Sequence, residues 1–406
     1  MERYQKHGYN DSNESTITRS GRGEKRGRRD PYTWLYQLKR LPLLLLIPLG
    51  IFLPRLVKNA PDKVERIYSR GIYPIISRVL GFINSLVPTS LAELIIVFVG
   101  GLLLLILVIR LIKIPFGKLY SRRRNRVRFF SYVITLGILA GVMLNLFYVL
   151  WGFNHYRQPL SKLMELDVHN RSVDELAELT EHLAREASEL RGMVSEDEKG
   201  VFTAGSREVA LRAIPSAYRA LGRDNELFSN KCYRPKSVIL SKTLSKLDIA
   251  GIYIPYIAEP NVNAEQPDLF FLSGASHEMG HYFGFAAEDE ANFIAYYASL
   301  WSNDAAFKYS AVMAALSSCA NSLNSSDSER YFEIRRNFYS EAMERDLADY
   351  REYYEKYENH PAAQVNNNIN DAYLHYHGHS DGLRSYGRDV DLLLALYEQG
   401  GMEYHS

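Results

Sequence analysis

Three apolar stretches constrain this chain more than any other feature of its sequence. They cover about residues 41–57, residues 91–109, which hold a single charge at Glu93, and residues 129–151, which hold none. The second and third are long enough to cross about 30 Å of hydrocarbon at about 1.5 Å per residue. The first is shorter, but the aromatic residues before it extend it to the length of a crossing. The sequence therefore predicts three N-terminal transmembrane α-helices, and the lipid bilayer as a partner.

The charges divide the chain into two unlike parts. Residues 1–151 carry a formal charge of +16, whereas the rest carries −15. Ten Lys and Arg lie in the first 40 residues and eight in residues 110–128, but only five lie in residues 58–90. Loops rich in Lys and Arg stay in the cytoplasm, so this bias orients all three spans. Arginine-rich runs also bind nucleic acid, but beside membrane spans orientation is a sufficient explanation, and we expect no nucleic-acid partner.

These observations define three regions. We expect residues 1–40 to form a basic cytoplasmic tail, residues 41–151 to form the membrane region, and residues 152–406 to form a domain outside the cytoplasm. The stretch over residues 72–87 in the first loop has the pattern of an amphipathic helix on the outer membrane surface.

The outer domain has the pattern of a mainly helical α+β fold. A helix begins at Ser172, where Glu175 completes a capping box, and helices are also expected over residues 328–357. The best strand candidates are residues 237–240 and 251–263, the second with an edge position indicated by its proline. Cys232 and Cys319, the two cysteines of the chain, form either a disulfide or two buried thiols.

One motif in this domain has the residue types and spacing of a zinc site. His277 and His281 are four residues apart in an expected helix over residues 268–283, so both imidazoles lie on one face and can reach one zinc ion. Glu278 follows the first histidine and projects beside the metal, which is the position of a general base that takes a proton from water.

A third metal ligand is expected from the acidic cluster that follows. Gly284 can end the first helix, and a second helix then begins in the acidic segment and can fold back. Glu288 or Glu290 would then reach the metal, leaving the fourth position for water. Charge at a helix N-terminus explains Glu288 by itself, whereas Glu290 shares a face with core residues such as Phe293.

The stretch HEMGHYFGFAAEDEANFIAYYA (277–298) resembles an uncharacterised family of bacterial membrane proteins, known as a domain of unknown function and placed with gluzincin-type metallopeptidases. Residues 251–263 and 370–397 resemble the same family, although PYIAEP stands where the family tends to have a Phe-Thr pair. The resemblance implies a zincin-like zinc metallopeptidase in the bacterial cell membrane. In the related ImmA/IrrE-like peptidases a Glu-x-Glu-Ala-Asn helix supplies the third zinc ligand, and that role falls here on Glu290, with Glu288 second.

The sequence thus predicts a membrane-anchored zinc metallopeptidase that hydrolyses an extracytoplasmic protein or peptide. An extended substrate would pair with the edge strand, which makes Tyr253, Ile254 and Tyr256 the candidate substrate-binding residues. Tyr386 is a candidate donor to a developing oxyanion, or else a structural tyrosine. The alternative function is a non-catalytic receptor or scaffold that keeps the zincin-like fold to bind a peptide or partner.

Three histidines at alternate positions, His375, His377 and His379, allow a second metal site or an exposed polar loop. The spacing suits a metal only if this segment is extended. An exposed loop is the simpler interpretation, because imidazoles are common on polar surfaces.

The charge bias leads to a prediction about topology. A reporter enzyme fused after Ser406 should be active outside the cytoplasm, because the basic tail and second loop hold the N-terminus of a three-span protein inside. Paired fusions of reporters that work only outside or only inside the cell would measure this. A stable fusion that is active only in the cytoplasm would contradict the orientation.

Overall fold

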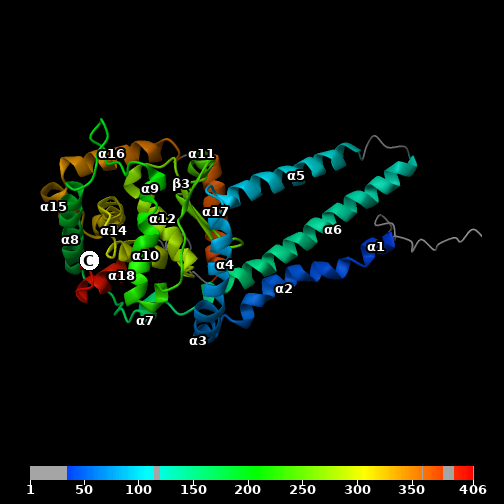
Figure 1. Ribbon diagram of the computed structural model, residues 1–406, viewed down its shortest axis with the longest axis horizontal. Coiled ribbons are helices and arrows are strands. Elements are labelled where there is room, and N and C mark those ends of the chain that lie inside the picture. Colours follow the sequence, from blue (N-terminus) through cyan, green and yellow to red (C-terminus); the bar gives the residue numbers. More distant parts are fainter. Residues whose placement is uncertain (1–33, 114–118, 359, 378–387, 406) are drawn as a thin grey trace, which may run out of the picture.

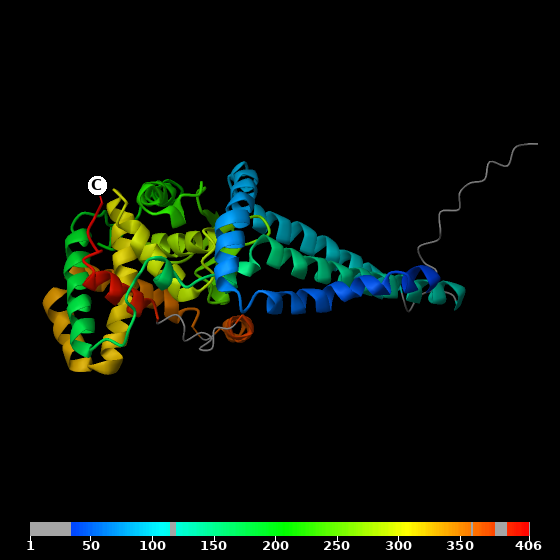
Figure 2. The ribbon, with the colours of Figure 1, turned by 90° about the horizontal axis from the view of Figure 1, so that it is seen from below.

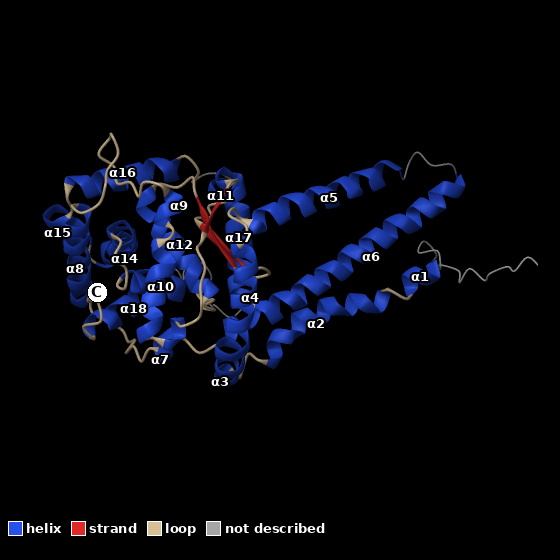
Figure 3. Cartoon of the chain, in the orientation of Figure 1, coloured by secondary structure: helices blue, strands red, loops and turns tan. Residues whose placement is uncertain are grey.

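Three long helices project from one end of a mainly helical body (Figure 1). The computed structural model describes residues 34–113, 119–358, 360–377 and 388–405. A three-stranded sheet lies at the end of the body from which the long helices leave (Figure 3). The expectation of a mainly helical chain with three apolar N-terminal helices and a small sheet is therefore confirmed.

The projecting helices correspond to the three predicted membrane spans. Segments long and apolar enough to cross a bilayer cover Trp34–Leu56, Leu91–Ile109 and Arg126–Leu150. The first begins seven residues before residue 41 because the preceding aromatic segment is already helical. Few of their side chains are buried, as contact with lipid requires. The elements that build them are α1 (Trp34–Leu38), η1 (Leu41–Leu45), α2 (Leu46–Phe52), η2 (Leu53–Leu56), α5 (Leu91–Lys113) and α6 (Leu119–Leu150).

The segment between the first two spans belongs to the body. It forms α3 (Pro61–Lys63), the π-helical η3 (Val64–Ile72) and α4 (Tyr73–Ser85). The Asn84 side-chain amide donates to the backbone oxygens of Ile257 and Ala258, both at 2.9 Å. The predicted amphipathic helix is confirmed as α4, and the body is built from this segment as well as from residues 152–406.

Helices make up most of the remaining body. The core is centred on α14, which packs against α8 and α12. The predicted capping box is present, because the Ser172 hydroxyl accepts from the Glu175 backbone N–H and the Glu175 carboxylate accepts from the Ser172 backbone N–H. The helices that follow the last span are η4 (Gly152–Tyr156), α7 (Leu160–Leu163), α8 (Val173–Arg191), α9 (Arg207–Ala210), α10 (Ala213–Asp224), η5 (Glu226–Phe228), α11 (Ser241–Lys246), α12 (Asp268–Tyr282), α13 (Glu288–Ser299), α14 (Ala305–Ser326), α15 (Ser328–Phe338), α16 (Glu341–Glu355), α17 (Pro361–Tyr376) and α18 (Asp389–Glu398).

The sheet has the strand order β1-β3-β2. Strand β1 (Lys236–Val238) runs parallel to β3 (Glu259–Asn263), and β2 (Gly251–Ile254) runs antiparallel to it. The predicted single strand over residues 251–263 is thus a hairpin. Pro255 falls in its turn, and Ala258 has a φ of 49°, which reverses the chain there. The edge position expected for the first half of this segment is correct for β2.

A buried carboxylate joins the sheet to the second span. Glu259 of β3 accepts from the Ser90 hydroxyl at 3.0 Å and from the backbone N–H groups of Leu91 and Ala92, so it caps the first turn of α5. Its charge is paired with the Lys236 ammonium at 2.6 Å. Capping by a buried, paired carboxylate fixes the start of the span against the body.

Both cysteines are buried free thiols, which decides between the two alternatives left open by the sequence. Burial raises the pKa of the Cys232 thiol to about 12 and the pKa of Cys319 well above its usual range. Thiols in such surroundings are unreactive, so we assign both to packing.

A buried ion pair holds the far side of the body together. The Arg191 guanidinium lies 2.6 Å from the Asp346 carboxylate, and both side chains are almost fully buried. Asp346 also accepts from the Tyr309 hydroxyl at 2.6 Å and from the Phe202 backbone N–H at 2.7 Å. Three parts of the chain that are distant in the sequence, residues 191–202, Tyr309 and Asp346, therefore meet at one carboxylate.

Removing the cation of this pair should destabilise the body strongly. Arg191→Met leaves the Asp346 charge buried without its partner, so we expect the free energy of unfolding to fall by about 3–5 kcal/mol. The control is Arg185→Met on the same helix, where the exposed pair with Glu181 contributes about 1 kcal/mol or less. Thermal unfolding of the purified variants in detergent measures the difference, and equal losses would contradict the assignment.

Candidate metal centre

Helix α12 carries the two histidines, and α13 folds back along it as expected. The first helix ends where Gly284 adopts a φ of 85°, a left-handed conformation that suits glycine. The two helices then pack closely at Gly280, where an added Cβ would lie 3.2 Å from the Ala291 Cα. This close approach brings the first turn of α13 against the histidines.

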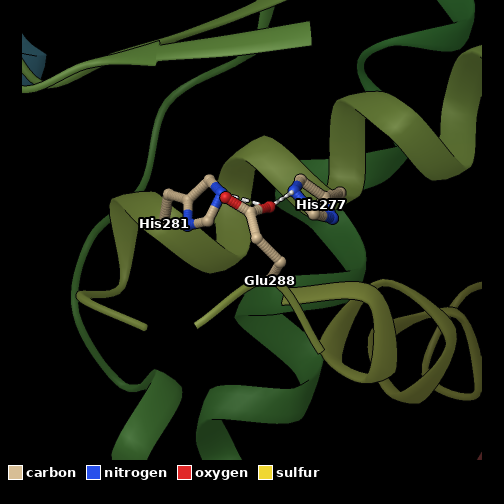
Figure 4. Close-up of side chains that lie close together, drawn as sticks. All are labelled: His277, His281 and Glu288. Carbon is tan, nitrogen blue, oxygen red and sulfur yellow. Dashed lines mark hydrogen bonds and ion pairs between the residues drawn. The ribbon is translucent and has the colours of Figure 1, made fainter. Parts of the chain in front are cut away.

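Three side chains converge at this contact. His277 Nε2 lies 3.1 Å and His281 Nε2 lies 3.6 Å from the same Glu288 oxygen (Figure 4). One candidate ligand atom from each residue lies within 4.8 Å of the other two. The two imidazole rings stand at 88° to each other. Two nitrogens and one carboxylate oxygen therefore point at a common position.

The second ring nitrogen of each histidine, Nδ1, is also hydrogen-bonded. His281 Nδ1 lies 2.7 Å from the Phe285 carbonyl oxygen, and His277 Nδ1 lies 2.7 Å from the Asn292 amide oxygen. A carbonyl oxygen only accepts, so Nδ1 carries the hydrogen and Nε2 presents its lone pair to the centre in the neutral ring. Metal-binding histidines are usually oriented in this way.

The electrostatics of the three side chains are strongly linked. Burial raises the pKa of Glu288, but the two imidazoles outweigh this effect and hold that pKa well below its usual range. Burial lowers the pKa of His281, but the Glu288 charge outweighs it and raises the pKa to about 9. The carboxylate thus remains charged and attracts a cation, which binds the imidazoles only in their neutral form.

Glu278 lies on the same helix but reaches another neighbour. Its side chain is buried against β2, where it accepts a hydrogen bond from the Tyr253 backbone N–H. An added Cβ at Gly251 would lie 2.6 Å from the Glu278 carboxylate, so glycine leaves room for it. Burial raises the pKa of Glu278 to about 6, an effect that the nearby His277 and His281 reduce. The carboxylate is therefore buried beside the cluster and is not part of it.

The structure places Glu290 away from the histidines, which corrects the assignment made from the sequence. Its carboxylate is buried and accepts from the Leu160 backbone N–H at 2.6 Å. Residues two apart in a helix point about 200° apart around its axis, so Glu288 and Glu290 cannot face α12 together. Glu290 does share the core side with Phe293, as expected, but the cluster lies on the other side. We therefore replace Glu290 by Glu288 as the third candidate ligand.

The end of α12 is held by side chains from the end of the third span and from α4. The Trp151 indole N–H, at the end of the third span, donates to the His281 backbone oxygen at 2.9 Å. The Tyr73 hydroxyl of α4 donates to the Tyr282 backbone oxygen at 2.8 Å. One of the candidate ligands is thus fixed directly to a membrane span.

The predicted substrate-binding residues lie next to this contact. The Tyr253 side chain is buried, with its hydroxyl 3.0 Å from that of Tyr73, and the Tyr256 hydroxyl donates to the Met143 backbone oxygen of α6 at 3.2 Å. Ile254 ends β2 and is partly exposed. Both tyrosine side chains are occupied, so the backbone edge of β2 is the part that an extended peptide could use.

Tyr386 and His379 lie outside the described residues. His375 is exposed on α17, whereas His377 is buried and its ring stacks on His155 with centroids 4.0 Å apart. Because His375 lies within a helix and is exposed whereas His377 is buried against His155, these two do not form a joint metal site.

Tyr373 was not predicted as a site residue, yet its phenol is close enough to Glu288 to be affected by that charge. Its hydroxyl lies 2.7 Å from His155 Nε2. Burial, and then the charge of Glu288, raises the pKa of Tyr373 well above its usual range. Tyr373 and His377 lie four residues apart on the helix side that faces η4, and this spacing was the available signal.

The fold and the cluster define a membrane-associated protein whose helical body holds two histidines and one carboxylate around a common point. The chain matches the family described as Protein of unknown function (DUF3810) over residues 68–394, and it belongs to this family. No curated protein and no solved structure matches the chain. The match begins within η3, so the shared region includes α4 from the segment between the first two spans.

The cluster leads to a prediction about metal binding. The purified full-length protein should bind about one zinc ion, and His277→Ala or His281→Ala should abolish binding because each removes one of three ligands. Glu288→Ala should weaken binding much more than Glu290→Ala, and Asn292→Ala should weaken it by about 10- to 100-fold. Elemental analysis and competition with a zinc chelator measure these effects. A larger loss in Glu290→Ala than in Glu288→Ala would contradict the ligand assignment.

Proposed function

We propose that the protein is a membrane-anchored zinc metallopeptidase with a zincin-like body, which hydrolyses peptide bonds of a protein or peptide outside the cytoplasm of a bacterial cell. One observation carries this proposal. The helix that presents His277 and His281 also presents Glu278, whose buried carboxylate lies between the cluster and the edge strand β2. A ligand set, a base and a strand for an extended peptide are thus adjacent.

The donors of the cluster fit zinc. Two imidazole nitrogens and one carboxylate oxygen are a usual ligand set for a catalytic zinc ion, which keeps its fourth position open. The hydrogen bonds of Nδ1 to Phe285 and Asn292 orient both rings. A zinc ion held there would lower the pKa of water toward about 7 and polarise a substrate carbonyl.

Glu278 is the proposed general base. Its pKa of about 6 leaves it ionised at neutral pH but close enough to accept and return a proton efficiently. The Tyr253 N–H and the space above Gly251 hold the carboxylate in place. Glu278 would take a proton from the attacking water and pass it to the leaving amine.

The substrate would bind as an extended chain along β2. Strand β2 pairs with β3 on one side only. Its other edge is available to a further strand, except where the Glu278 side chain lies against it. The Tyr253 and Tyr256 side chains serve to position this strand, and Ile254 offers the partly exposed apolar contact. Substrate selection would therefore depend on backbone pairing beside the base.

A hydrogen-bond donor is also needed for the oxyanion that forms from the substrate carbonyl. Tyr373 is a candidate, because its hydroxyl is positioned by His155 and its phenol lies near Glu288. Tyr386, predicted for the same role, remains a second candidate. Tyr373→Phe tests the first by removing the hydroxyl while keeping the ring.

A receptor or scaffold with the same fold is the rival function. Such a protein needs the metal only for shape, and it has no use for an ionisable group beside it. Burying a carboxylate with few partners costs stability, and Glu278 is almost fully buried. Glu278 is buried next to three candidate ligands despite this loss of stability, and this supports the catalytic function over the receptor or scaffold.

Glu278→Gln separates the two functions. The Gln side chain can still accept from the Tyr253 N–H but cannot accept a proton from water, so zinc content should stay the same while hydrolysis falls by about 10²- to 10⁴-fold. The assay compares peptide fragments released by membranes from wild-type and deletion strains, by mass spectrometry. Glu341→Gln, at an exposed position of α16, is the matched control and should behave as wild type.

Full complementation of the deletion strain by Glu278→Gln, together with failure of His277→Ala, would refute the catalytic function. Zinc would then be needed for shape or binding, as in the rival. Loss of zinc in Glu278→Gln would instead show that this residue is a ligand.

A further inference from the structure

Helix α4 is amphipathic in the reverse of the usual sense. Apart from Tyr73 at its first position, the residues that it buries against the body are small or polar, namely Ser77, Gly81 and Asn84. The apolar residues face outward and are between 49% and 68% exposed. They are Ile72, which precedes the helix, Ile75, Val79, Phe82, Ile83 and Leu86, which follows it. A soluble protein rarely leaves such a continuous apolar face in water.

Hydrogen bonds fix α4 in this orientation. Asn84 is bound to the β2–β3 turn, and the Tyr282 hydroxyl of α12 donates to the Ser77 backbone oxygen at 3.1 Å. Gly81 has no room for a side chain, because an added Cβ would lie 2.8 Å from the Tyr233 ring. The helix therefore cannot turn its apolar face inward without breaking these contacts.

A second helix and a turn also expose apolar residues at the end of the body from which the spans leave. On α17, Val365, Ile369 and Tyr376 are exposed, and the Tyr376 hydroxyl donates to the Ile51 backbone oxygen of the first span at 2.9 Å. Before α11, Ile239 and Leu240 are exposed, and their backbone N–H groups donate to Glu93 in the first turn of α5.

Both helices run across the long axis of the molecule, whereas the spans run roughly along it. Figure 1 shows α4 and α17 side-on at the base of the spans, and Figure 2 shows α17 end-on at the same level. Helices with one apolar face that lie at the ends of membrane spans are typical of the boundary between headgroups and acyl chains.

We propose that α4 and α17 lie in the surface layer of the bilayer, with lipid covering their exposed apolar faces. We further infer that the proposed peptidase acts on segments of membrane-attached polypeptides close to the bilayer. Lipid is the occupant that the observations favour, because these faces continue directly into the lipid-facing surface of the spans. A second copy of the chain or another protein would have to bind at a surface that the bilayer already reaches.

The position of the candidate metal centre supports the inferred substrate class. His281 is bound through its backbone to Trp151 at the end of the third span, and Tyr256 in the β2–β3 turn is bound to α6 at Met143. Residue 143 lies eight residues before Trp151, about 12 Å along a helix, so this turn reaches beside the span. A peptide paired with β2 would therefore lie close to the bilayer. This step depends on the proposed function, whereas the placement of α4 and α17 does not.

Site-specific fluorescence tests the placement. Ile75→Cys and Ile369→Cys, each labelled with a polarity-sensitive dye in the full-length chain in liposomes, should show blue-shifted emission and quenching by lipids with a doxyl group on the acyl chain. Both native thiols are buried and so should not take the label. Phe332→Cys on α15, at the far end of the body and likewise exposed, is the control and should be quenched only by aqueous iodide.

Iodide quenching of the α4 and α17 labels to the level of the control would overturn the placement. Shielding that disappears as the ratio of protein to lipid is lowered would also overturn it, because a second copy would then be the occupant. Neither result depends on zinc or on hydrolysis.

Tethered peptides test the substrate class. A mixed-sequence peptide library, joined to a phospholipid through a short spacer, should be cleaved on the order of tenfold or more faster than the same library free in solution. The double variant Val79→Glu and Phe82→Glu should lose this advantage but keep its zinc, which also serves as the check on folding. Equal cleavage of tethered and free peptides would overturn the substrate class, and cleavage of neither by the zinc-loaded protein would refute the proposed function alone.

Discussion

The last carbonyl groups of α12 accept hydrogen bonds from Trp151, at the end of the third span, and from Tyr73 of α4, and the position of the whole centre depends on them. Trp151 binds the carbonyl of His281, and Tyr73 binds that of Tyr282. Carbonyl groups at the end of a buried helix need partners, and here the partners come from a span and from the helix beside it. His281 is thus both a candidate ligand and a point at which the body is fixed to the third of the long apolar helices, which makes the distance between the centre and these helices a property of the fold.

The pair His277 and His281 and the three spans could be read from the sequence, because both follow from local helix geometry. The third ligand could not, because it depends on how α13 is rotated against α12. That rotation is set by the close contact between Gly280 and Ala291, which no local pattern contains. A signal did exist in the four-residue spacing of Glu288 and Asn292, since both had to face the same histidine.

Two further features were beyond sequence reasoning for the same reason. The hairpin over residues 251–263 resembles one strand because the segment is rich in β-branched and aromatic residues, and its turn becomes evident only from the pairing of β2 with β3. The segment between the first two spans has the composition of a loop with an amphipathic helix, and its place in the body depends on contacts about 200 residues away in the sequence, such as that of Tyr73 with Tyr282. Composition indicates that a helix has two unlike faces, but not which of them meets protein.

The cap on α5 has a consequence for the order in which the protein is assembled. Leu91 begins the second span, yet the carboxylate that receives its N–H belongs to Glu259, 168 residues later. The first turn of α5 must therefore leave the ribosome with these N–H groups bonded to water. It gains its cap only after β3 has been made and the sheet has formed, so the folding of the body completes the start of α5. A nascent chain arrested before residue 259 would hold α5 without this cap.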